Sequence, residues 1–360
     1  GAGVAVNSDG SVTRSLLVRL AHQKSINKEI LSKVGFMPDS TYGSQLSSHG
    51  TGTIKPEGQL TVEYEMIVGK YPDGLSYTLR KPIYSIQNLA YGAFDKETII
   101  APRIGSALVG LGLLERISEK DLLKNEDIND ENRDGISGKA NYTFDPETNT
   151  TLLGRFTWKA SATSIKHQSA AAAHNDMGLS NPLFPTDNCS DKQIACQEVS
   201  KSKQKELYAL DLPQHRLDAI TFYLQNLAVP KQREIGKHKE GEALFEHLSC
   251  VKCHVSNFTT TDGVKINPYS DLLLHNMGEA LADGRSEFLA TGTEWRTAPL
   301  WGIGLRQKVS GEANFLHDGR ARTIEEAILW HGGEAQKSKE AFMQLSKKQR
   351  EKLLLFLQTI

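Results

Sequence analysis

The chain has 360 residues, a length sufficient for two domains that each bury a core of their own. Its 42 lysines and arginines nearly balance its 43 aspartates and glutamates, so the overall charge favours neither nucleic acid nor an anionic membrane as a partner. The longest apolar run, residues 107–114, is too short to cross a bilayer, so we expect no membrane span.

The first third of the chain has the pattern of strands and loops. Residues 16–20 form a short apolar run, and between residues 60 and 68 apolar and polar side chains alternate, which is the period of a half-buried strand. A Pro-Asp-Gly tripeptide at 72–74 favours a turn into a second run around residues 77–79. We therefore predict a β-hairpin.

A polar, acidic segment follows and resembles a calcium-binding loop. Asp130, Asn132 and Asp134 stand at alternate positions before a glycine, as ligands 1, 3 and 5 of an EF-hand do, and the carbonyl of Ile136 has place 7. Place 12 holds Asn instead of Glu, which removes the usual bidentate ligand. A plain Asx-rich turn has the same composition, so both interpretations stay open.

A denser group of polar and aromatic residues lies between 154 and 185, around an Ala-rich stretch that favours a helix. Each residue taken alone has an ordinary structural explanation, since a tryptophan is usually core and an aspartate often caps a helix end. Composition alone does not make this an active site. Its candidate pocket residues are Trp158, Lys159, His167, Gln168, His174, Asp176 and Met177.

Two cysteines follow, Cys189 and Cys196, with no histidine beside either one. We predict that they form a disulfide, which would close a short loop and stabilise the fold by about 2–3 kcal/mol.

Residues 217–228 have apolar side chains at helical spacing and end before a proline and a charged stretch. A domain boundary is therefore predicted near residue 232. It divides the chain into an N-terminal domain, 1–232, and a C-terminal domain, 233–360.

The most specific motif opens the second domain. Cys250 and Cys253, followed by His254, form a C-x-x-C-H run at the end of a predicted helix over 240–249. Covalent haem attachment uses two such cysteines, while the histidine binds iron. A thioredoxin-like pair leaves the histidine unexplained, and a zinc site would need a further C-x-x-C. Haem c together with a disulfide indicates an oxidising compartment such as a periplasm.

Helices are also predicted over 323–330 and 346–360, each with a capping-box pattern at its start. We therefore expect a mainly α fold with cytochrome c-like domains and some β-hairpin structure in the N-terminal half. The second iron ligand is not decided by chemistry alone, because His and Met both serve. The candidates are His275, Met277, His317 and His331.

Long strings in the chain resemble known families. TAPLWGIG, FLHDGR and TIEEA resemble the C-terminal domain of bacterial di-haem cytochrome c peroxidases. The chain as a whole is more similar to the di-haem cytochrome c oxidoreductases described as thiol oxidoreductases. The strings that carry this second resemblance are GRFTWKA (154–160), DMG (176–178), LLLHNMG (272–278) and WHGGEA (330–335).

The resemblance implies roles for several residues. It makes His331 the first choice for the distal ligand of the C-terminal haem, with Met277 second. It places Trp158 between two haems, ten residues before Gln168, and Asp176 beside the haem that reacts with peroxide.

The family also contains the turn from His317 to Arg320. We expect this turn to have a packing role in which Arg320 pairs with a haem propionate.

One departure concerns the number of haem motifs. The family carries two C-x-x-C-H runs, and this chain contains one. The chain begins with Gly1 and shows no charged-then-apolar leader, so we expect a processed or truncated form in which the first motif is missing.

Two functions follow as hypotheses. The first is a peroxidase-like oxidoreductase, in which the C-terminal haem passes electrons from a small donor, such as a cytochrome or a cupredoxin, to an N-terminal haem and a small-molecule oxidant. The alternative is a non-catalytic electron-transfer or haem-binding protein of the periplasm, linked to iron handling.

Overall fold

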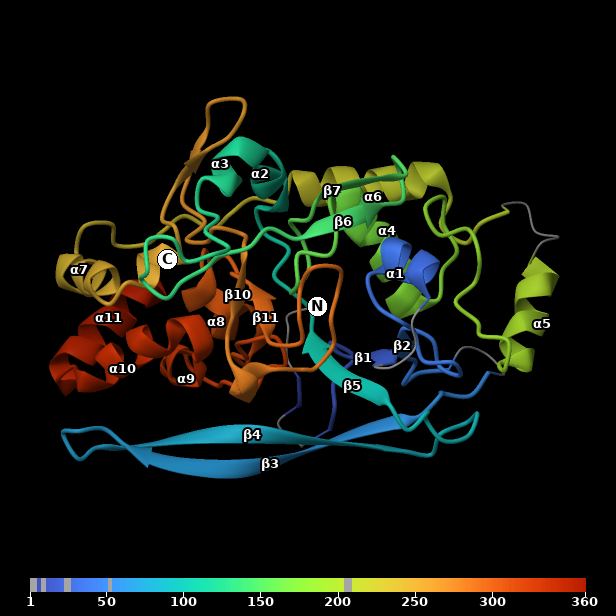
Figure 1. The fold of residues 1–360 in the computed structure, drawn as a ribbon, viewed down its shortest axis with the longest axis horizontal. Coiled ribbons are helices and arrows are strands. Elements are labelled where there is room, and N and C mark those ends of the chain that lie inside the picture. Colours follow the sequence, from blue (N-terminus) through green and yellow to red (C-terminus); the bar gives the residue numbers. More distant parts are fainter. Residues whose placement is uncertain (1–4, 8–10, 23–26, 51–53, 204–208) are drawn as a thin grey trace.

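The computed structural model describes residues 5–7, 11–22, 27–50, 54–203 and 209–360. Helices make up 31% of the described residues and strands 22%, the strands lying in small antiparallel sheets. The prediction of a mainly helical chain is therefore only partly right, because short strand pairs occur in both halves (Figure 1). Within the described ranges, no helix is long and apolar enough to cross a membrane.

An antiparallel sheet in the order β2-β1-β5 begins the N-terminal half. Leu16, Val18 and Leu20 alternate along its central strand and bury their side chains in one core. This alternation is the period-2 pattern of a half-buried strand. The elements of this part are β1 (Leu16–His22), α1 (Lys28–Val34), β2 (Gln45–Leu46) and β5 (Thr98–Ile104).

The predicted hairpin is confirmed as a long two-stranded ribbon, β3 (Gln59–Lys70) with β4 (Ser76–Gln87). It runs beneath both halves of the molecule in Figure 1. At one end Leu60 packs into the N-terminal core, and at the other Tyr71 and Leu79 pack into the C-terminal core. The ribbon therefore ties the two halves together.

The middle of the chain supplies the helix that carries Gln168 and Asp176. This helix, α4, starts where the side chain of Ser164 accepts a hydrogen bond from the backbone N–H of His167, ends at Gly178, and packs against α6. The middle elements are α2 (Leu111–Glu115), α3 (Glu119–Leu123), β6 (Tyr142–Asp145), β7 (Thr150–Leu153), α4 (Ile165–Met177), α5 (Ile194–Lys203) and α6 (Gln214–Gln225).

In the C-terminal half, helices surround the C-x-x-C-H segment, and α7 packs against α11 (Figure 1). The capping box predicted at Ser346 and Gln349 is confirmed at the start of α11. The elements are α7 (Lys239–His247), η1 (Cys250–Lys252), β8 (Phe258–Thr259), β9 (Lys265–Ile266), β10 (Leu274–Asn276), η2 (Glu279–Leu281), β11 (Glu294–Arg296), η3 (Ile303–Leu305), α8 (Arg306–Ser310), α9 (Ile324–Trp330), η4 (Gly333–Ala335), α10 (Gln336–Gln344) and α11 (Lys347–Thr359).

One buried cluster contains residues from both sides of residue 232. Leu114 and Ile117 from the middle of the chain pack there with Leu272, Leu273 and Trp301. The two halves thus share a core, and the boundary near residue 232 stays a prediction.

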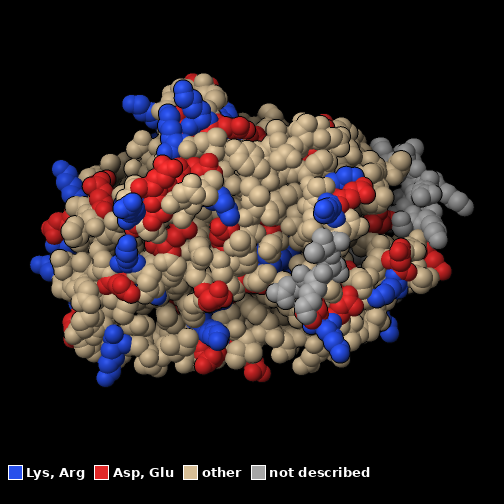
Figure 2. Space-filling view, viewed as in Figure 1, with Lys and Arg blue, Asp and Glu red and all other residues tan. Residues whose placement is uncertain are grey.

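Charged side chains of both signs are interspersed on the face shown in Figure 2. This agrees with a formal net charge of only −1. No single sign dominates that face, so it offers no large field that would steer a charged partner.

Candidate functional site

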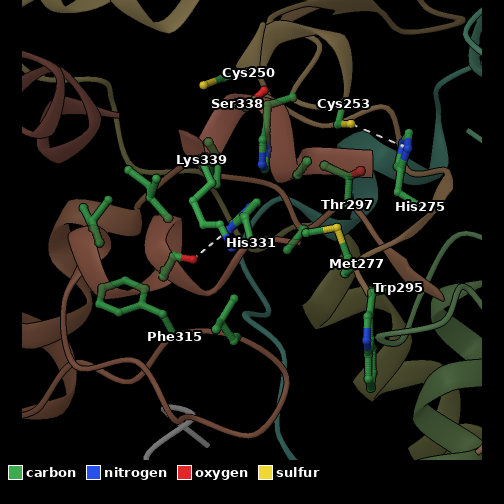
Figure 3. A pocket seen from close by; sticks show the side chains of 18 of the residues that line it. Cys250, Cys253, His275, Met277, Trp295, Thr297, Phe315, His331, Ser338 and Lys339 are labelled. Carbon is green, nitrogen blue, oxygen red and sulfur yellow. Dashed lines mark hydrogen bonds between the residues drawn. The ribbon is translucent and has the colours of Figure 1, made fainter. Parts of the chain in front are cut away.

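A cavity of about 210 Å³ lies beside the C-x-x-C-H segment, and its lining is mostly apolar (Figure 3). Side chains from α7, α9, α10 and α11 form part of its wall, and the C-x-x-C-H turn and the loops between residues 275 and 317 supply much of the rest. Cofactor sites usually measure about 300–1,000 Å³. A porphyrin therefore needs some lining side chains to move apart, or it keeps one edge in solvent.

The thiols of Cys250 and Cys253 line this cavity and are not bonded to each other. The turn of η1 directs them, and the N–H of His254 donates to the carbonyl of Cys250 at 2.9 Å. Burial raises the pKa of Cys250 to about 12 and also raises the pKa of Cys253. Both groups are therefore protonated thiols at neutral pH, which disfavours a thioredoxin-like redox pair.

Two histidines that line the cavity have the same hydrogen-bond arrangement. The Nδ1 of His254 lies 2.8 Å from the carbonyl of Tyr269, and the Nδ1 of His331 lies 2.7 Å from the carbonyl of Ala327. Because a carbonyl only accepts, each Nδ1 carries the proton and each Nε2 keeps its lone pair. Metal-binding histidines are typically oriented in this way. Burial also lowers the pKa of both rings, that of His254 to about 4.

The segment after His331 packs directly against the segment that carries Met277. A Cβ built on Gly333, which has a φ of +53°, would lie 2.1 Å from the carbonyl oxygen of Asn276 and 2.7 Å from the nitrogen of Gly278. Glycine is therefore required at this contact. This close packing brings His331 and Met277, the first and second choices for the iron ligand, into the lining of the same cavity.

His275 also lines the cavity, but both of its ring nitrogens are occupied. Its Nε2 lies 2.8 Å from the carboxylate of Asp271, and its Nδ1 lies 2.7 Å from that of Glu334. Burial alone would lower the pKa of His275, yet these two carboxylates raise it well above its ordinary value. A doubly hydrogen-bonded imidazolium has no lone pair for iron, which removes His275 from the ligand candidates.

His317 lines the cavity at another wall, where its ring stacks on Trp295 with centroids 3.8 Å apart and planes 13° apart. Arg320 does not line the cavity. Its guanidinium lies 2.8 Å from the carboxylate of Asp318 and stacks over the ring of Trp330. Within the described residues, Arg320 is thus paired with the chain's own carboxylate, and its pairing with a propionate stays a prediction.

The structure brings Trp158, Gln168 and Asp176 together in the lining of a second, larger cavity of about 760 Å³. The side-chain oxygen of Gln168 is buried there without a hydrogen-bond partner among the described residues. Asp176 is exposed at the end of α4 and forms a 3.2 Å ion pair with Arg19. The size of this cavity is in the usual range of a cofactor site.

The two cavities share a wall. Trp158 is part of it, and the indole N–H donates to the carbonyl of Ile104 at 2.7 Å, which fixes the ring. The residues that line both cavities are Trp158, Arg296, Ala298, Pro299 and Arg306. Trp158 thus lines two cavities, and its expected position between two haems stays a prediction.

The acidic loop gives no support to the calcium interpretation. Asp130 accepts from the N–H of Gly135, and Asn132 and Asp134 cap the turn in the same way at later positions. The ammonium of Lys252 lies 2.7 Å from the Asp134 carboxylate, so this carboxylate is paired with a lysine instead of a metal ion. Among the described residues no cluster of three His, Cys, Asp or Glu side chains could hold a metal ion. An Asx-rich turn accounts for the segment, including the backbone of Ile136.

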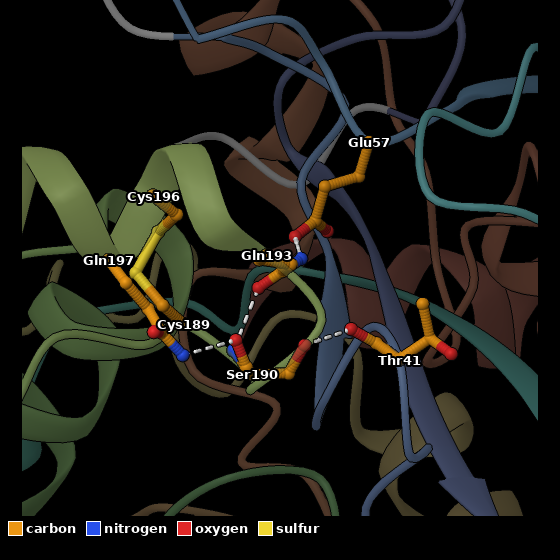
Figure 4. Close-up of a disulfide and its surroundings, with 7 residues drawn as sticks. All are labelled: Thr41, Glu57, Cys189, Ser190, Gln193, Cys196 and Gln197. Atoms are coloured by element: carbon orange, nitrogen blue, oxygen red, sulfur yellow. Dashed lines mark hydrogen bonds between the residues drawn. A yellow bond between two sulfur atoms is a disulfide. The ribbon is translucent and has the colours of Figure 1, made fainter.

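The predicted disulfide between Cys189 and Cys196 is present (Figure 4). The loop that it closes contacts the N-terminal part of the chain, because Ser190 donates to the carbonyl of Thr41 and the amide of Gln193 donates to the carboxylate of Glu57. Burial raises the pKa of that carboxyl to about 7.

Sequence reasoning missed three functional candidates. Arg296 and Arg306 belong to the shared wall, and Glu334 holds His275. Glu334 lies in the string WHGGEA, which drew attention to it only as part of a resemblance. No local pattern distinguishes the two arginines from surface arginines.

The chain matches the model of one known protein family. The family model described as "Di-haem oxidoreductase, putative peroxidase" matches residues 48–360. No curated protein is significantly similar to the chain. Among solved structures, hydrazine synthase of Kuenenia stuttgartiensis, pressurised with xenon, matches with 15% identity and a TM-score of 0.29, covering 52% of this chain and 66% of that chain. The match thus covers just under two thirds of that chain, and a likeness this weak carries no argument about function.

Proposed function

This chain belongs to the di-haem oxidoreductase family, and from that premise we propose that it is a haem-dependent, peroxidase-like oxidoreductase. In this proposal Cys250 and Cys253 would attach a haem c, and His254 and His331 would hold its iron. The observation that carries the proposal is the pair of histidines in one cavity, each with Nδ1 bonded to a carbonyl and Nε2 left as a ligand.

The chemistry of these four residues fits the cofactor. A haem c, when bound, supplies reversible one-electron transfer at its iron. An iron held by both histidines would favour electron transfer over the binding of an oxidant. The lining of the site is mostly apolar. We therefore assign electron entry to the C-terminal cavity, with a small protein such as a cytochrome or a cupredoxin as donor.

Reduction of the oxidant is assigned to the second cavity, where a second haem, as in the di-haem family, would deliver the electrons to the oxidant. One peroxide needs two electrons and two protons to give two waters. Trp158 lines both cavities, so its ring lies on the short path for electrons between them. Asp176 lines the second cavity and is open to solvent, so it can take a proton from water and deliver it there. The unpartnered oxygen of Gln168 can accept a hydrogen bond from a bound oxidant.

All four cysteines of the chain are accounted for, two in the disulfide and two at the C-terminal cavity. A second haem therefore cannot be attached through cysteines of these 360 residues. The disulfide supports an oxidising compartment, and we propose a periplasmic location on that ground.

A second candidate function is electron transfer or haem binding without catalysis, with a role in iron handling. The observation that favours it is the same pair of histidines, because an iron held by both would favour electron transfer over chemistry on small molecules. The two candidates differ in what happens at the second cavity.

The test is the peroxide-dependent oxidation of a reduced cytochrome by the haem-loaded protein. We expect turnover that falls by at least about tenfold in Trp158→Phe, since about 1.4 kcal/mol added to a barrier has this effect. A Trp301→Phe variant is the matched control, because Trp301 lines only the second cavity. No turnover with haem fully loaded, together with a spectrum that neither peroxide nor carbon monoxide changes, would leave electron transfer as the function.

A further inference from the structure

Two arginines stand in the wall between the two cavities. Arg296 ends β11, where its backbone N–H donates to the carbonyl of Trp158 at 2.8 Å. Arg306 begins α8. Each lines both cavities.

Within the described chain these guanidiniums are hydrogen-bonded to neutral groups. Arg296 donates to the carbonyls of Thr157 and Thr297 at 2.7 and 3.1 Å. Arg306 donates to the carbonyl of Asn314 at 2.9 Å. No carboxylate of a described residue forms an ion pair with either one, although the charge of Asp271 acts on Arg296 from farther away. Arg296 is buried and Arg306 is half-buried.

Other buried arginines of the chain are satisfied in different ways. Arg103 is paired with Asp283 at 2.6 Å, and Arg320 with Asp318 at 2.8 Å. Arg155 donates to several carbonyls and lines neither cavity. Arg296 and Arg306 are therefore distinguished by having no anionic partner and by facing space in which a ligand can supply one.

A buried cation without an anion is costly, because it gives up hydration for weak partners. Burial lowers the pKa of Arg296 to about 10 and also lowers that of Arg306, and the charge of Asp271 only partly opposes the effect on Arg296. A ligand carboxylate would remove this cost, since a guanidinium binds a carboxylate through two parallel hydrogen bonds.

We propose that Arg296 and Arg306 form a carboxylate-binding site in the wall between the cavities and bind the acidic groups of the ligands on either side. For the haem c of the proposed function, on which this inference rests, these groups are the propionates. The wall thus recognises a ligand that is apolar over most of its surface and carries carboxylates at one edge.

The first test measures the midpoint potential of the haem-loaded chain by spectroelectrochemistry. Loss of a cation near the haem disfavours reduction. At a fixed applied potential we expect Arg296→Gln and Arg306→Gln each to lower the ratio of reduced to oxidised protein about tenfold, or about 59 mV for one electron.

Arg296→Lys and Arg306→Lys keep the positive charge and should restore most of the parent's ratio of reduced to oxidised protein. Arg116→Gln, which removes an exposed arginine paired with Asp262, is the matched control and should change the ratio less than about twofold. Gln variants that carry haem and stay within twofold of the parent would overturn the inference while leaving the proposed function intact.

The second test does not depend on haem loading. Zinc protoporphyrin, which has two carboxylates, and its dimethyl ester, which has none, are titrated into the purified chain and followed by fluorescence. We expect the diacid to bind at least about tenfold more tightly, and the double variant with Gln at 296 and 306 to lose that preference. Equal binding of both porphyrins, or binding of neither, would overturn the claim that this wall binds carboxylates. A chain that cannot be loaded with haem would refute the proposed function and leave this preference as the test of the wall.

Discussion

Replacement of Glu334 by Gln tests the packing of the segment that carries His331. The carboxylate of Glu334 accepts from the ring of His275 at 2.7 Å, from the backbone N–H of Asn276 at 2.9 Å and from that of Ser137 at 3.0 Å. Three segments that are distant in sequence thus meet at one side chain, only 12% of which is exposed.

The magnitude follows from these contacts. Hydrogen bonds to charged groups contribute about 1.5–3 kcal/mol each. Glutamine keeps one acceptor oxygen but loses the charge that faces His275, and it turns an NH₂ toward a donor. We therefore expect Glu334→Gln to lower the free energy of unfolding by about 2–4 kcal/mol, which a domain stable by about 5–15 kcal/mol survives.

The stability that Glu334→Gln loses should depend on pH. Burial alone would raise the pKa of Glu334, but the hydrogen bond and charge of His275 hold it below the unfolded value of 4.5. A depressed folded pKa stabilises the protein above the unfolded value, and this contribution is lost as the pH falls through the folded pKa. The difference between the parent and Glu334→Gln should therefore be full at about pH 6 and shrink below about pH 4.

Urea unfolding of both proteins at these two pH values measures the difference, with the exposed Glu279→Gln as control. A loss below about 1 kcal/mol at pH 6, or a loss that stays constant with pH, would refute the role given to Glu334.

The remaining predictions concern the iron ligand, the acidic loop and the disulfide. His331→Ala should convert the haem c spectrum from six- to five-coordinate and Met277→Ala should not, and the reverse result would transfer the ligand role to the methionine. Chelator treatment should move the melting temperature by less than about 1 °C, because Lys252 already pairs with the loop, whereas a clear calcium-dependent rise in calorimetry would restore the metal site. Replacing Cys189 and Cys196 by Ser should lower the free energy of unfolding by about 2–3 kcal/mol in urea titration, and an unchanged midpoint would show that the loop is held by its other contacts.

Local patterns in the sequence predicted the elements that depend on local interactions. The β3–β4 ribbon follows from alternation over 60–68 and a Pro-Asp-Gly turn, and the start of α11 from a capping box at Ser346 and Gln349. The fold class was only partly predicted, because strands of two or three residues, such as β8 and β10, are too short to show a period. Their pairing depends on tertiary contacts.

In the candidate site, too, local motifs could be predicted and long-range contacts could not. Cys250, Cys253 and His254 are adjacent in sequence, so a motif could identify them. The resemblance selected His331 and Trp158, and the structure places both beside a cavity. By contrast, the removal of His275 from the ligand candidates depends on Glu334, which is 59 residues away. Such long-range contacts have no signature in a single sequence.

The two-arginine wall could not be predicted for a related reason. The sequence suggested Arg320 as the partner of a propionate because of its turn, whereas the structure pairs Arg320 with Asp318 and leaves Arg296 and Arg306 facing the cavities. Whether an arginine is paired depends on the carboxylates that the fold brings near it, and composition does not contain that information.

The central claim is that Cys250 and Cys253 attach a haem c whose iron His254 binds. Its most direct measurement is the mass and visible spectrum of the chain purified from cells that contain a cytochrome c maturation system. The account predicts a mass increment of one haem, an α band on reduction, and the loss of both when the two cysteines are replaced by Ala. A chain of unmodified mass with no α band under these conditions would contradict it.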